Sequence, residues 1–414
     1  MSLSQADLST DRPAFSHWIR SSNNVTQQFL AIGGQPDFVS LAGGLPAAEL
    51  YPVEAIKQAS ARALDRWGSA ALEYGPVEGF PALRAAIAER MSKEHRHRFG
   101  IENILLTTGA MQGLDLIGKV LIDPGDLIVA QFPTYLGALD AWRTRRPGYR
   151  KLDWNLDDPD FLEALPRAKF VYSVPNYSNP TGALVPQNAR GGLLSRAIEA
   201  NTWLVEDDPY LPLQLTGAAG PSILSADAAT RPDGQYDGPV IYLGTLSKSV
   251  APGLRVGWIV AEPKLIQLLA LAKQCSDLSS SMFSQAVALE FLESGTESEI
   301  IPRTVACYRE RRDALCASAR ALLSEWFDWE VPPGGMFLWA RAKSPDFDTN
   351  QLYSFALQEK VAFVPSSVFD PNGALTNAMR VNFTRNTPER LEEGVRRLRR
   401  AVERYLSSQS NGEV

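Results

Sequence analysis

Short apolar runs alternate with helical stretches through the middle of the chain, and this alternation restricts its possible folds more than any other feature. The runs cover residues 101–106, 127–131, 170–174, 203–205, 240–244 and 256–260. Strands separated by helices predict a mostly parallel sheet flanked by helices, which is an α/β fold. Open sheets of this kind bind ligands at the carboxyl ends of their strands. The residues that directly follow each run are therefore the first candidates for a site.

The rest of the chain predicts a second, smaller domain. Residues 51–91 have the apolar period of helices, with a stop at Gly68 and a Tyr-Gly-Pro turn at 74–76, and a second helix covers about 81–98. A long helical region at 263–324 precedes short strands and a last helix. We expect an N-terminal arm with part of the small domain at 1–50, a large domain at 51–300 and a small α+β domain at 301–414.

The composition argues against several kinds of partner. The chain carries 41 Lys and Arg against 47 Asp and Glu, so no overall field attracts nucleic acid or anionic lipid. No apolar run reaches the ~18 residues of a membrane span. Three cysteines and three histidines argue against a disulfide framework and a metal centre, and His95 and His97 are expected on a solvated surface. The N-terminal residues lack the apolar segment of a signal peptide, so we expect a cytoplasmic protein.

Polar motifs follow the first three runs, and each alone has an ordinary explanation. Residues 107–113 open a helix whose first N–H groups can hold an anion, or they form a plain strand-to-helix turn. Tyr135 follows the second run and either stacks on a planar ligand or fills the core. Segment 174–182, with two Asn and two Pro, is a turn by composition.

The next two runs end in residues that packing alone explains poorly. Glu206, Asp207 and Asp208 end an apolar strand, where three carboxylates repel one another unless a cation lies near them. Lys248 stands between hydroxyl side chains, seven residues before Arg255. Lysine is rarely buried without a partner. These two strand ends therefore indicate a functional site.

Together, the strand-end residues meet the chemical needs of pyridoxal 5′-phosphate. A desolvated lysine carries an aldehyde as an imine, and a neighbouring acid pairs with a protonated ring nitrogen. Asn and Tyr hydrogen-bond a ring hydroxyl, while Thr, Ser, Arg and a helix N-terminus hold a phosphate. The sequence therefore favours this cofactor.

The motifs resemble those of fold-type I, pyridoxal-phosphate-dependent aminotransferases of class I/II, in the subgroup of the 2-aminoadipate, kynurenine and aromatic aminotransferases. The resemblance extends from the Ala-Gly-Gly-Leu-Pro segment at 42–46 to the Met-Arg-Val-Asn-Phe segment at 379–383. Each motif is weakly specific, but five of them follow in the family's order. The resemblance implies the family's fold, its cofactor, and amino acids and 2-oxo acids as substrates.

By this resemblance, Lys248 is the Schiff-base lysine and also the base that moves the α-proton of the substrate. Asp207 would pair with the ring nitrogen and keep it protonated, which leaves Asp208 a supporting or merely structural role. Asn179 and Tyr210 would hydrogen-bond the ring hydroxyl.

The remaining cofactor contacts come from the same resemblance. Tyr135 would stack on the ring. Tyr74 matches a tyrosine that reaches the phosphate of the neighbouring subunit, which implies a homodimer with shared sites. The phosphate would be held by Ala110, Met111, Thr245, Ser247 and Arg255, where the first two offer only backbone N–H groups.

The resemblance also assigns the substrate contacts. Arg380 would bind the α-carboxylate through two parallel hydrogen bonds, a geometry that lysine does not offer. Gly43 and Gly44 would let the backbone approach the substrate, and Asn179 would lie beside it.

The substrate side chain depends on the N-terminal arm. Members that act on 2-aminoadipate often carry an arginine in the arm that binds a second carboxylate, whereas the stretch 24–27 here has none. Arg20 is the nearest replacement, although a solvated arm position is the simpler reading. We therefore expect an aromatic or other bulky neutral amino acid, with 2-oxoglutarate as acceptor.

Three alternatives remain open at this point. The chain is a 2-aminoadipate-type aminotransferase, or it is a lyase, decarboxylase or racemase that uses the same Lys248 and Asp207 to break a different bond at the α-carbon. A DNA-binding regulator can also carry this domain behind a helix-turn-helix. Only about forty residues precede the Gly-Gly segment here, without a basic recognition helix, which disfavours the regulator.

Overall fold

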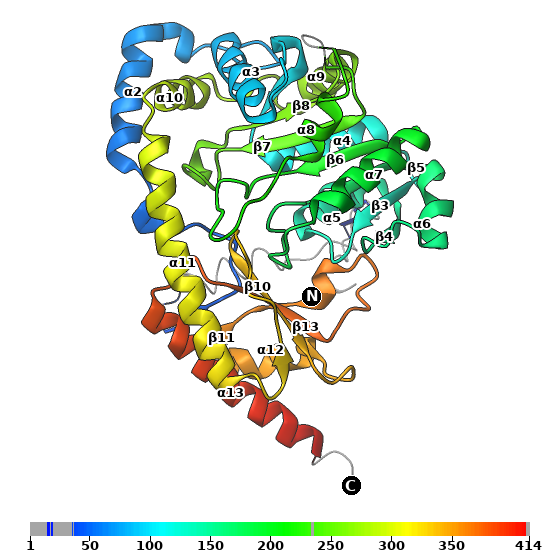
Figure 1. Ribbon diagram of the computed structural model, residues 1–414. Coiled ribbons are helices and arrows are strands. Elements are labelled where there is room, and N and C mark those ends of the chain that lie inside the picture. The colour runs from blue at the N-terminus through cyan, green and yellow to red at the C-terminus, as the bar shows by residue number, and fades with distance from the viewer. Residues whose placement is uncertain (1–14, 17, 20–34, 36, 233–235, 411–414) are drawn as a thin grey trace.

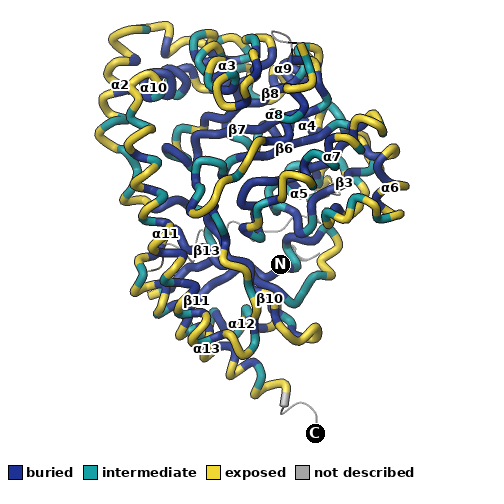
Figure 2. The backbone as a smooth tube through the Cα atoms, in the orientation of Figure 1, coloured by how far each residue is buried: buried dark blue, intermediate teal, exposed yellow. Residues whose placement is uncertain are grey.

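The computed structural model describes residues 15–16, 18–19, 35, 37–232 and 236–410. Figure 1 shows two lobes, an upper one around a large sheet and a lower one around smaller sheets. Helix α11 (Glu297–Leu322) begins in the upper lobe and runs down along the lower one. Buried residues concentrate in the strands, whereas the outer faces of the helices are exposed (Figure 2).

The upper lobe is built on a seven-stranded sheet in the order β2-β8-β7-β6-β5-β3-β4. Strand β8 runs antiparallel to β2 and β7, and the other neighbours are parallel. The predicted mostly parallel α/β sheet is therefore confirmed. The strands are β2 (Ile104–Thr107), β3 (Leu127–Gln131), β4 (Gly148–Leu152), β5 (Ala168–Ser173), β6 (Trp203–Asp207), β7 (Val240–Thr245) and β8 (Gly257–Val260).

The predicted runs miss strand β4, because its sequence is not apolar. It reads Gly-Tyr-Arg-Lys-Leu and forms the edge of the sheet, where only Leu152 is buried. Exposed charged side chains suit an edge strand, which pairs on one side only. Two predicted strands also begin later than expected, since residues 101–103 form a 3₁₀ helix before β2 and β8 starts at Gly257.

Helices cover both faces of this sheet. Strand side chains alternate between the two cores, so that Ile241 and Leu243 belong to one core and Val240 and Tyr242 to the other. The first core includes α4 (Ala110–Leu121), α5 (Leu136–Trp142) and α9 (Pro263–Asp277). The second includes α2 (Val53–Trp67), α3 (Pro81–His95), α6 (Pro159–Ala164), α7 (Gln187–Glu199), α8 (Ile223–Ala228) and α10 (Met282–Glu293).

The lower lobe contains an antiparallel sheet in the order β12-β13-β10-β9 and a parallel pair β1-β11. Because β1 pairs with β11, a segment before residue 50 lies beside the C-terminal part of the chain. The domain boundaries given above stay a prediction. The elements are β1 (Val39–Ser40), β9 (Phe327–Asp328), β10 (Phe337–Ala342), α12 (Thr349–Gln358), β11 (Val361–Ala362), β12 (Val364–Pro365), β13 (Ala378–Asn382) and α13 (Pro388–Ser410).

The prediction of solvated histidines is wrong. Helix α3 ends at His95 rather than near residue 98, because Arg96 adopts a left-handed backbone with a φ of 53°. The chain then turns inward, and His95 and His97 are 4% and 5% exposed. The Nδ1 atom of His95 lies 2.8 Å from the Ser222 hydroxyl oxygen at the start of α8. His95 therefore takes part in packing between α3 and α8, whereas the His97 ring packs against Phe99 and Tyr236.

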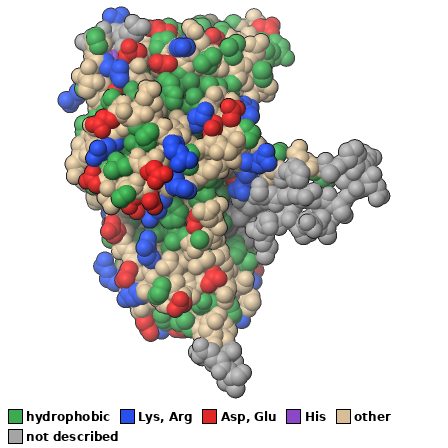
Figure 3. All heavy atoms as spheres, turned by 90° about the vertical axis from the view of Figure 1, so that its right-hand side faces the viewer, with side chains coloured by type: hydrophobic (Ala, Val, Ile, Leu, Met, Phe, Trp, Pro, Cys, Tyr) green, Lys and Arg blue, Asp and Glu red, His purple; other side chains and the backbone are tan. Residues whose placement is uncertain are grey.

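Among the described residues, no helix is both long enough and apolar enough to cross a bilayer. On the face shown in Figure 3, Lys and Arg side chains are interspersed with Asp and Glu side chains. The cytoplasmic location stays a prediction.

Candidate active site

A cavity of about 330 Å³ opens where the carboxyl ends of the parallel strands meet the lower lobe. It is reached by loops that follow strands of the large sheet, by α4 and α5, by the 42–45 segment and by β13. It brings together eight of the residues that the sequence predicts for the site, which are Gly43, Gly44, Met111, Tyr135, Asn179, Tyr210, Lys248 and Arg380.

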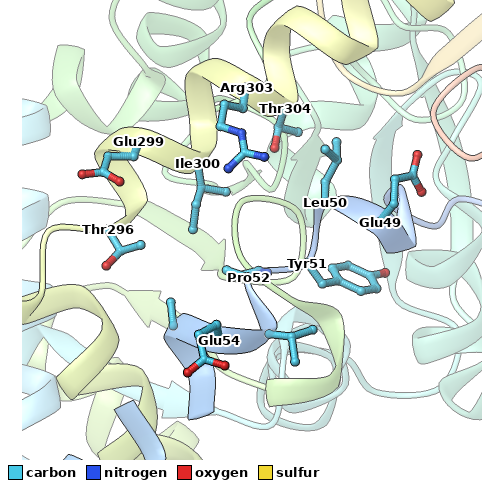
Figure 4. Close-up of a pocket in the computed structure, with 12 residues that line it drawn as sticks. Glu49, Leu50, Tyr51, Pro52, Glu54, Thr296, Glu299, Ile300, Arg303 and Thr304 are labelled. Atoms are coloured by element: carbon cyan, nitrogen blue, oxygen red, sulfur yellow. The ribbon is translucent and has the colours of Figure 1, made fainter. Parts of the chain in front are cut away.

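A second cavity, of about 380 Å³, has no such residues. It lies between the start of α2 and helix α11 (Figure 4). Its walls include the side chains of Glu54, Glu299 and Arg303, and no predicted site residue lines it. The first cavity is therefore the candidate active site.

Lys248 follows β7 and is half-buried in the wall of this cavity. Its Nζ atom donates a hydrogen bond of 3.0 Å to the carbonyl oxygen of Gly44. Burial lowers the pKa of Lys248 to about 8, and the positive charges of Arg380 and Arg255 act in the same direction. A lowered pKa gives the amine a substantial neutral fraction near neutral pH, which both a nucleophile and a base require.

Asp207 is the last residue of β6 and is 2% exposed. Its Oδ2 atom accepts a hydrogen bond of 2.8 Å from the Tyr172 hydroxyl. Its Oδ1 atom is buried and, within the described part of the chain, receives no hydrogen bond. Burial raises the pKa of Asp207 to about 7. A buried carboxylate oxygen without a donor suits a cationic N–H group of a ligand.

The two neighbouring acids point to the opposite face of the sheet. Glu206 accepts hydrogen bonds of 2.9 and 2.8 Å from the backbone N–H groups of Ile223 and Leu224, at the start of α8. Asp208 accepts hydrogen bonds from Asn176 at 3.0 Å and from the Tyr242 hydroxyl at 3.2 Å. Strand alternation thus separates the three carboxylates, and Asp207 alone faces the side of Tyr172.

Arg380 comes from β13, in the lower lobe, and is 7% exposed. Its Nη1 atom donates to Asn179 Oδ1 and its Nη2 atom to the carbonyl oxygen of Ala42, both at 2.7 Å. The guanidinium lies 4.2 Å from the ring centroid of Phe337 and 5.0 Å from that of Phe369. These contacts hold its planar fork in one orientation, which suits a carboxylate ligand.

The start of α4 forms the predicted anion site. Gly109 precedes the helix with a φ of 78° and offers no capping side chain, so the first N–H groups of the helix remain for a ligand. A Cβ atom on Gly257 would lie 2.9 Å from the Ala110 nitrogen, so only glycine permits this close approach of β8. The Nη2 atom of Arg255 donates to the Thr108 carbonyl at 2.9 Å and lies directly over Gly109.

Thr245 is the last residue of β7, and Ser247 follows it on the way to Arg255. Their hydroxyl oxygens are 2.9 Å apart, and Thr245 also donates to the carbonyl oxygen of Val256 at 2.9 Å. This turn therefore presents hydroxyl groups next to Lys248.

Two tyrosine rings complete the walls. A Cβ atom on Gly137 would lie 2.4 Å from the Tyr135 ring, so the ring rests directly on this glycine. The Tyr135 hydroxyl lies 3.8 Å from the sulfur of Met111. The Tyr210 hydroxyl accepts a hydrogen bond of 3.4 Å from Asn179, and its ring meets that of Phe337 edge-on.

Of the other predicted site residues, the structure describes five at the strand ends and at the start of α4 without placing them in the cavity lining, namely Ala110, Asp207, Thr245, Ser247 and Arg255. Two further predicted contributors are not found near the cavity. Tyr74 is 78% exposed and lines a separate surface hollow beside Met282. Arg20 and the stretch 24–27 lie outside the described residues.

Sequence reasoning misses three residues that the structure places at the site. Tyr172 contacts Asp207, Phe337 packs on Arg380, and Gly137 supports Tyr135. A tyrosine inside the apolar run 170–174 is the one signal available, because a buried hydroxyl needs a partner. Nothing in the sequence pairs residue 337 with residue 380.

Comparison with known proteins agrees with this geometry. Residues 36–398 match the family described as aminotransferase class I and II. The chain is 37% identical over 392 residues to the aromatic-amino-acid aminotransferase 1 of Thermococcus litoralis, over 92% of this chain and 91% of the relative. It is 38% identical over 396 residues to the 2-aminoadipate transaminase of Thermus thermophilus, over 94% and 96%. It is similar to the structure of a Pyrococcus horikoshii kynurenine aminotransferase in complex with PMP, with a TM-score of 0.87, 33% identity and coverage of 95% and 97%.

Proposed function

The chain belongs to the aminotransferase class I and II family, and on that premise we propose that it transfers the amino group of an aromatic or other bulky neutral amino acid to 2-oxoglutarate. It is a pyridoxal-phosphate-dependent enzyme with the fold-type I architecture. The observation that supports the proposed substrate class is the chemical character of the residues that line the cavity. Lys248 and Arg380 are its only cationic residues within the described part of the chain, and Leu45, Leu136 and Val364 make it largely apolar.

The cavity residues fit the cofactor. The unpartnered Oδ1 atom of Asp207 suits the protonated ring nitrogen, and the Tyr135 ring offers a stacking surface. Asn179 and Tyr210 would hydrogen-bond the ring hydroxyl. The phosphate would be held by the backbone of Ala110 and Met111 and by Thr245, Ser247 and Arg255.

The bound cofactor supplies an electron-withdrawing ring that stabilises negative charge on the substrate α-carbon. Arg380 binds the carboxylate of the substrate and so orients it. Gly43 and Gly44 have no side chains, so their backbone leaves room beside the substrate. The neutral Nζ atom of Lys248 takes the proton from the substrate α-carbon and would deliver it to the C4′ carbon of the cofactor. Asp207, as a carboxylate, keeps the ring nitrogen protonated, so that the ring accepts charge throughout the transfer.

We also propose a homodimer with shared sites. The Tyr74 side chain is exposed at the surface and lines a hollow separate from the cavity of its own chain. Leu72, Leu271 and Leu278 are likewise exposed apolar residues of the upper lobe. A second copy would cover such residues and bring its Tyr74 to the phosphate of the first.

The alternatives differ in measurable products. A lyase, decarboxylase or racemase would use the same Lys248 and Asp207 but would not release the 2-oxo acid of the donor. The distal carboxylate of 2-aminoadipate, like that of the acceptor 2-oxoglutarate, calls for a second cation. No further Lys or Arg lines the cavity among the described residues, and Arg20 of the arm lies outside them.

The proposal is tested with a panel of amino donors against 2-oxoglutarate and pyruvate, by following loss of the yellow cofactor colour and formation of each 2-oxo acid. We expect the highest kcat/KM for phenylalanine, tyrosine, kynurenine or leucine. A profile that peaks sharply at 2-aminoadipate or glutamate alone would contradict the proposed substrate class. Products without a 2-oxo acid would instead support one of the other reactions.

Replacing Arg380 by alanine is expected to raise KM for the amino donor strongly, with a smaller change in kcat. The substrate carboxylate loses a charge-assisted partner in a buried site, a loss of about 2 to 5 kcal/mol. Steady-state kinetics with phenylalanine and with its methyl ester measure the effect, because the ester has no carboxylate to lose. Arg341→Ala, on the exposed side of neighbouring β10, is the matched control and should leave KM unchanged. Equal KM values for Arg380→Ala and wild type would contradict the assignment.

A further inference from the structure

We infer that Tyr172 is a positioning residue for amino-group transfer, whose hydroxyl fixes the Asp207 carboxylate so that its Oδ1 atom stays directed at the cofactor. The inference rests on the role proposed for Asp207. It concerns a residue of β5 that the strand-end motifs do not include.

The geometry of this contact is fixed by packing. Tyr172 is fully buried, and β5 pairs with β6 so that Tyr172 stands beside Val205, two residues before Asp207. Its ring meets Trp142 edge-on, with the ring centroids 5.1 Å apart. Packing therefore holds the ring in place, and its hydroxyl donates to Asp207 Oδ2 at 2.8 Å.

The hydrogen bond makes the two oxygen atoms of the Asp207 carboxylate inequivalent. Oδ2 is occupied by Tyr172, whereas Oδ1 has no donor among the described residues. Without the hydroxyl, the carboxylate is free to rotate, and either oxygen can turn away from the ligand. Tyr172 thus selects the orientation in which Oδ1 is left as a buried acceptor for a ligand.

The same bond favours the ionised acid. Burial raises the pKa of Asp207 to about 7, and the negative charge of Asp208 acts in the same direction, while the Tyr172 hydrogen bond and the positive charge of Lys248 lower it. The hydroxyls of Tyr135 and Tyr210 also lie within electrostatic range. Loss of the Tyr172 donor therefore moves the pKa of Asp207 upward, towards a neutral acid that no longer forms an ion pair with a charged ring nitrogen.

The test is Tyr172→Phe, which removes the hydroxyl and keeps the ring. Apoprotein is titrated with pyridoxal phosphate, and the absorbance of the loaded protein is followed against pH. We expect about tenfold weaker cofactor binding, in line with a lost hydrogen bond to a charged group. The midpoint of the absorbance change should move to higher pH, because a ring with less positive charge makes the nitrogen at Lys248 easier to protonate.

Tyr236→Phe is the matched control. Tyr236 is also fully buried, and its hydroxyl also donates to a buried carboxylate at 2.8 Å, that of Asp227, but Asp227 is not one of the residues proposed to contact the cofactor. Both variants should lose similar thermal stability, and only Tyr172→Phe should change cofactor affinity and the absorbance midpoint. Equal changes in the two variants, or unchanged affinity and midpoint in Tyr172→Phe, would overturn the inference.

Asp207→Asn separates this inference from the proposed function. If Asp207→Asn weakens cofactor binding and shifts the midpoint while Tyr172→Phe does not, only the role of Tyr172 fails. If Asp207→Asn itself behaves as the wild type, the proposed role of Asp207 fails, and the inference about Tyr172 fails with it.

Discussion

Replacing Lys248 by alanine is expected to lower kcat by more than about 10⁴-fold, because one side chain acts as both nucleophile and proton carrier. No other lysine lines the cavity within the described residues, so no second amine can take over. The lowered pKa, about 8, also makes this amine more reactive near neutral pH than an exposed lysine. Turnover is measured with the best donor of the panel. Borohydride reduction followed by peptide mass spectrometry should find a cofactor adduct on Lys248 in the wild type and none in the variant.

Lys343→Ala is the control for this experiment. The Lys343 ammonium also donates to a backbone carbonyl, that of Ser324, but at a distance from the cavity. Wild-type activity is expected for it. Substantial turnover in Lys248→Ala, or a borohydride adduct on another lysine, would rule out the assignment of Lys248.

The second large effect is expected for Asp207→Ala, which should lower kcat by several powers of ten, each factor of ten being ~1.4 kcal/mol. The substitution removes the buried carboxylate that keeps the ring nitrogen charged, so the ring no longer accepts electrons well. Single-turnover loss of cofactor colour with excess amino donor measures this half-reaction directly. The variant should also bind the cofactor more weakly, since the ring nitrogen loses its charged partner.

Asp208→Asn tests whether this effect belongs to one carboxylate only. Asp208 lies next in sequence but on the other face of the sheet, where Asn176 and Tyr242 donate to it. We expect less than about a tenfold change, because the amide keeps the shape and one acceptor oxygen. Near-normal turnover in Asp207→Ala, or equal losses in both variants, would refute the assignment of Asp207 as the partner of the ring nitrogen.

The strand ends were the most predictable part of the site, for a simple geometric reason. Carboxyl ends of parallel strands share one edge of a sheet, so residues after separate apolar runs meet there. Asn179, Tyr210 and Lys248 line one cavity in this way, although up to 69 positions separate them in sequence. The predicted fold, family and cofactor are confirmed.

Contacts across the fold were not predictable. Asn179 and Arg380 are 201 positions apart and come from different lobes, so their hydrogen bond depends on how the lobes pack. His95 and His97 look like solvated residues in a charged segment, yet the turn at Arg96 carries them inward. The apolar pattern of the sequence does not reveal strand β4, because a mostly exposed edge strand does not need apolar residues.

Six of the seven strands of the large sheet, the order of the motifs and the lysine after β7 follow from the sequence alone, because apolar periodicity and strand-end position are local properties of the chain. The tertiary structure alone decided which carboxylate of 206–208 faces Tyr172 and which oxygen remains without a donor. Those features depend on side-chain orientation and on neighbours from other strands, which come together only when the sheet is packed.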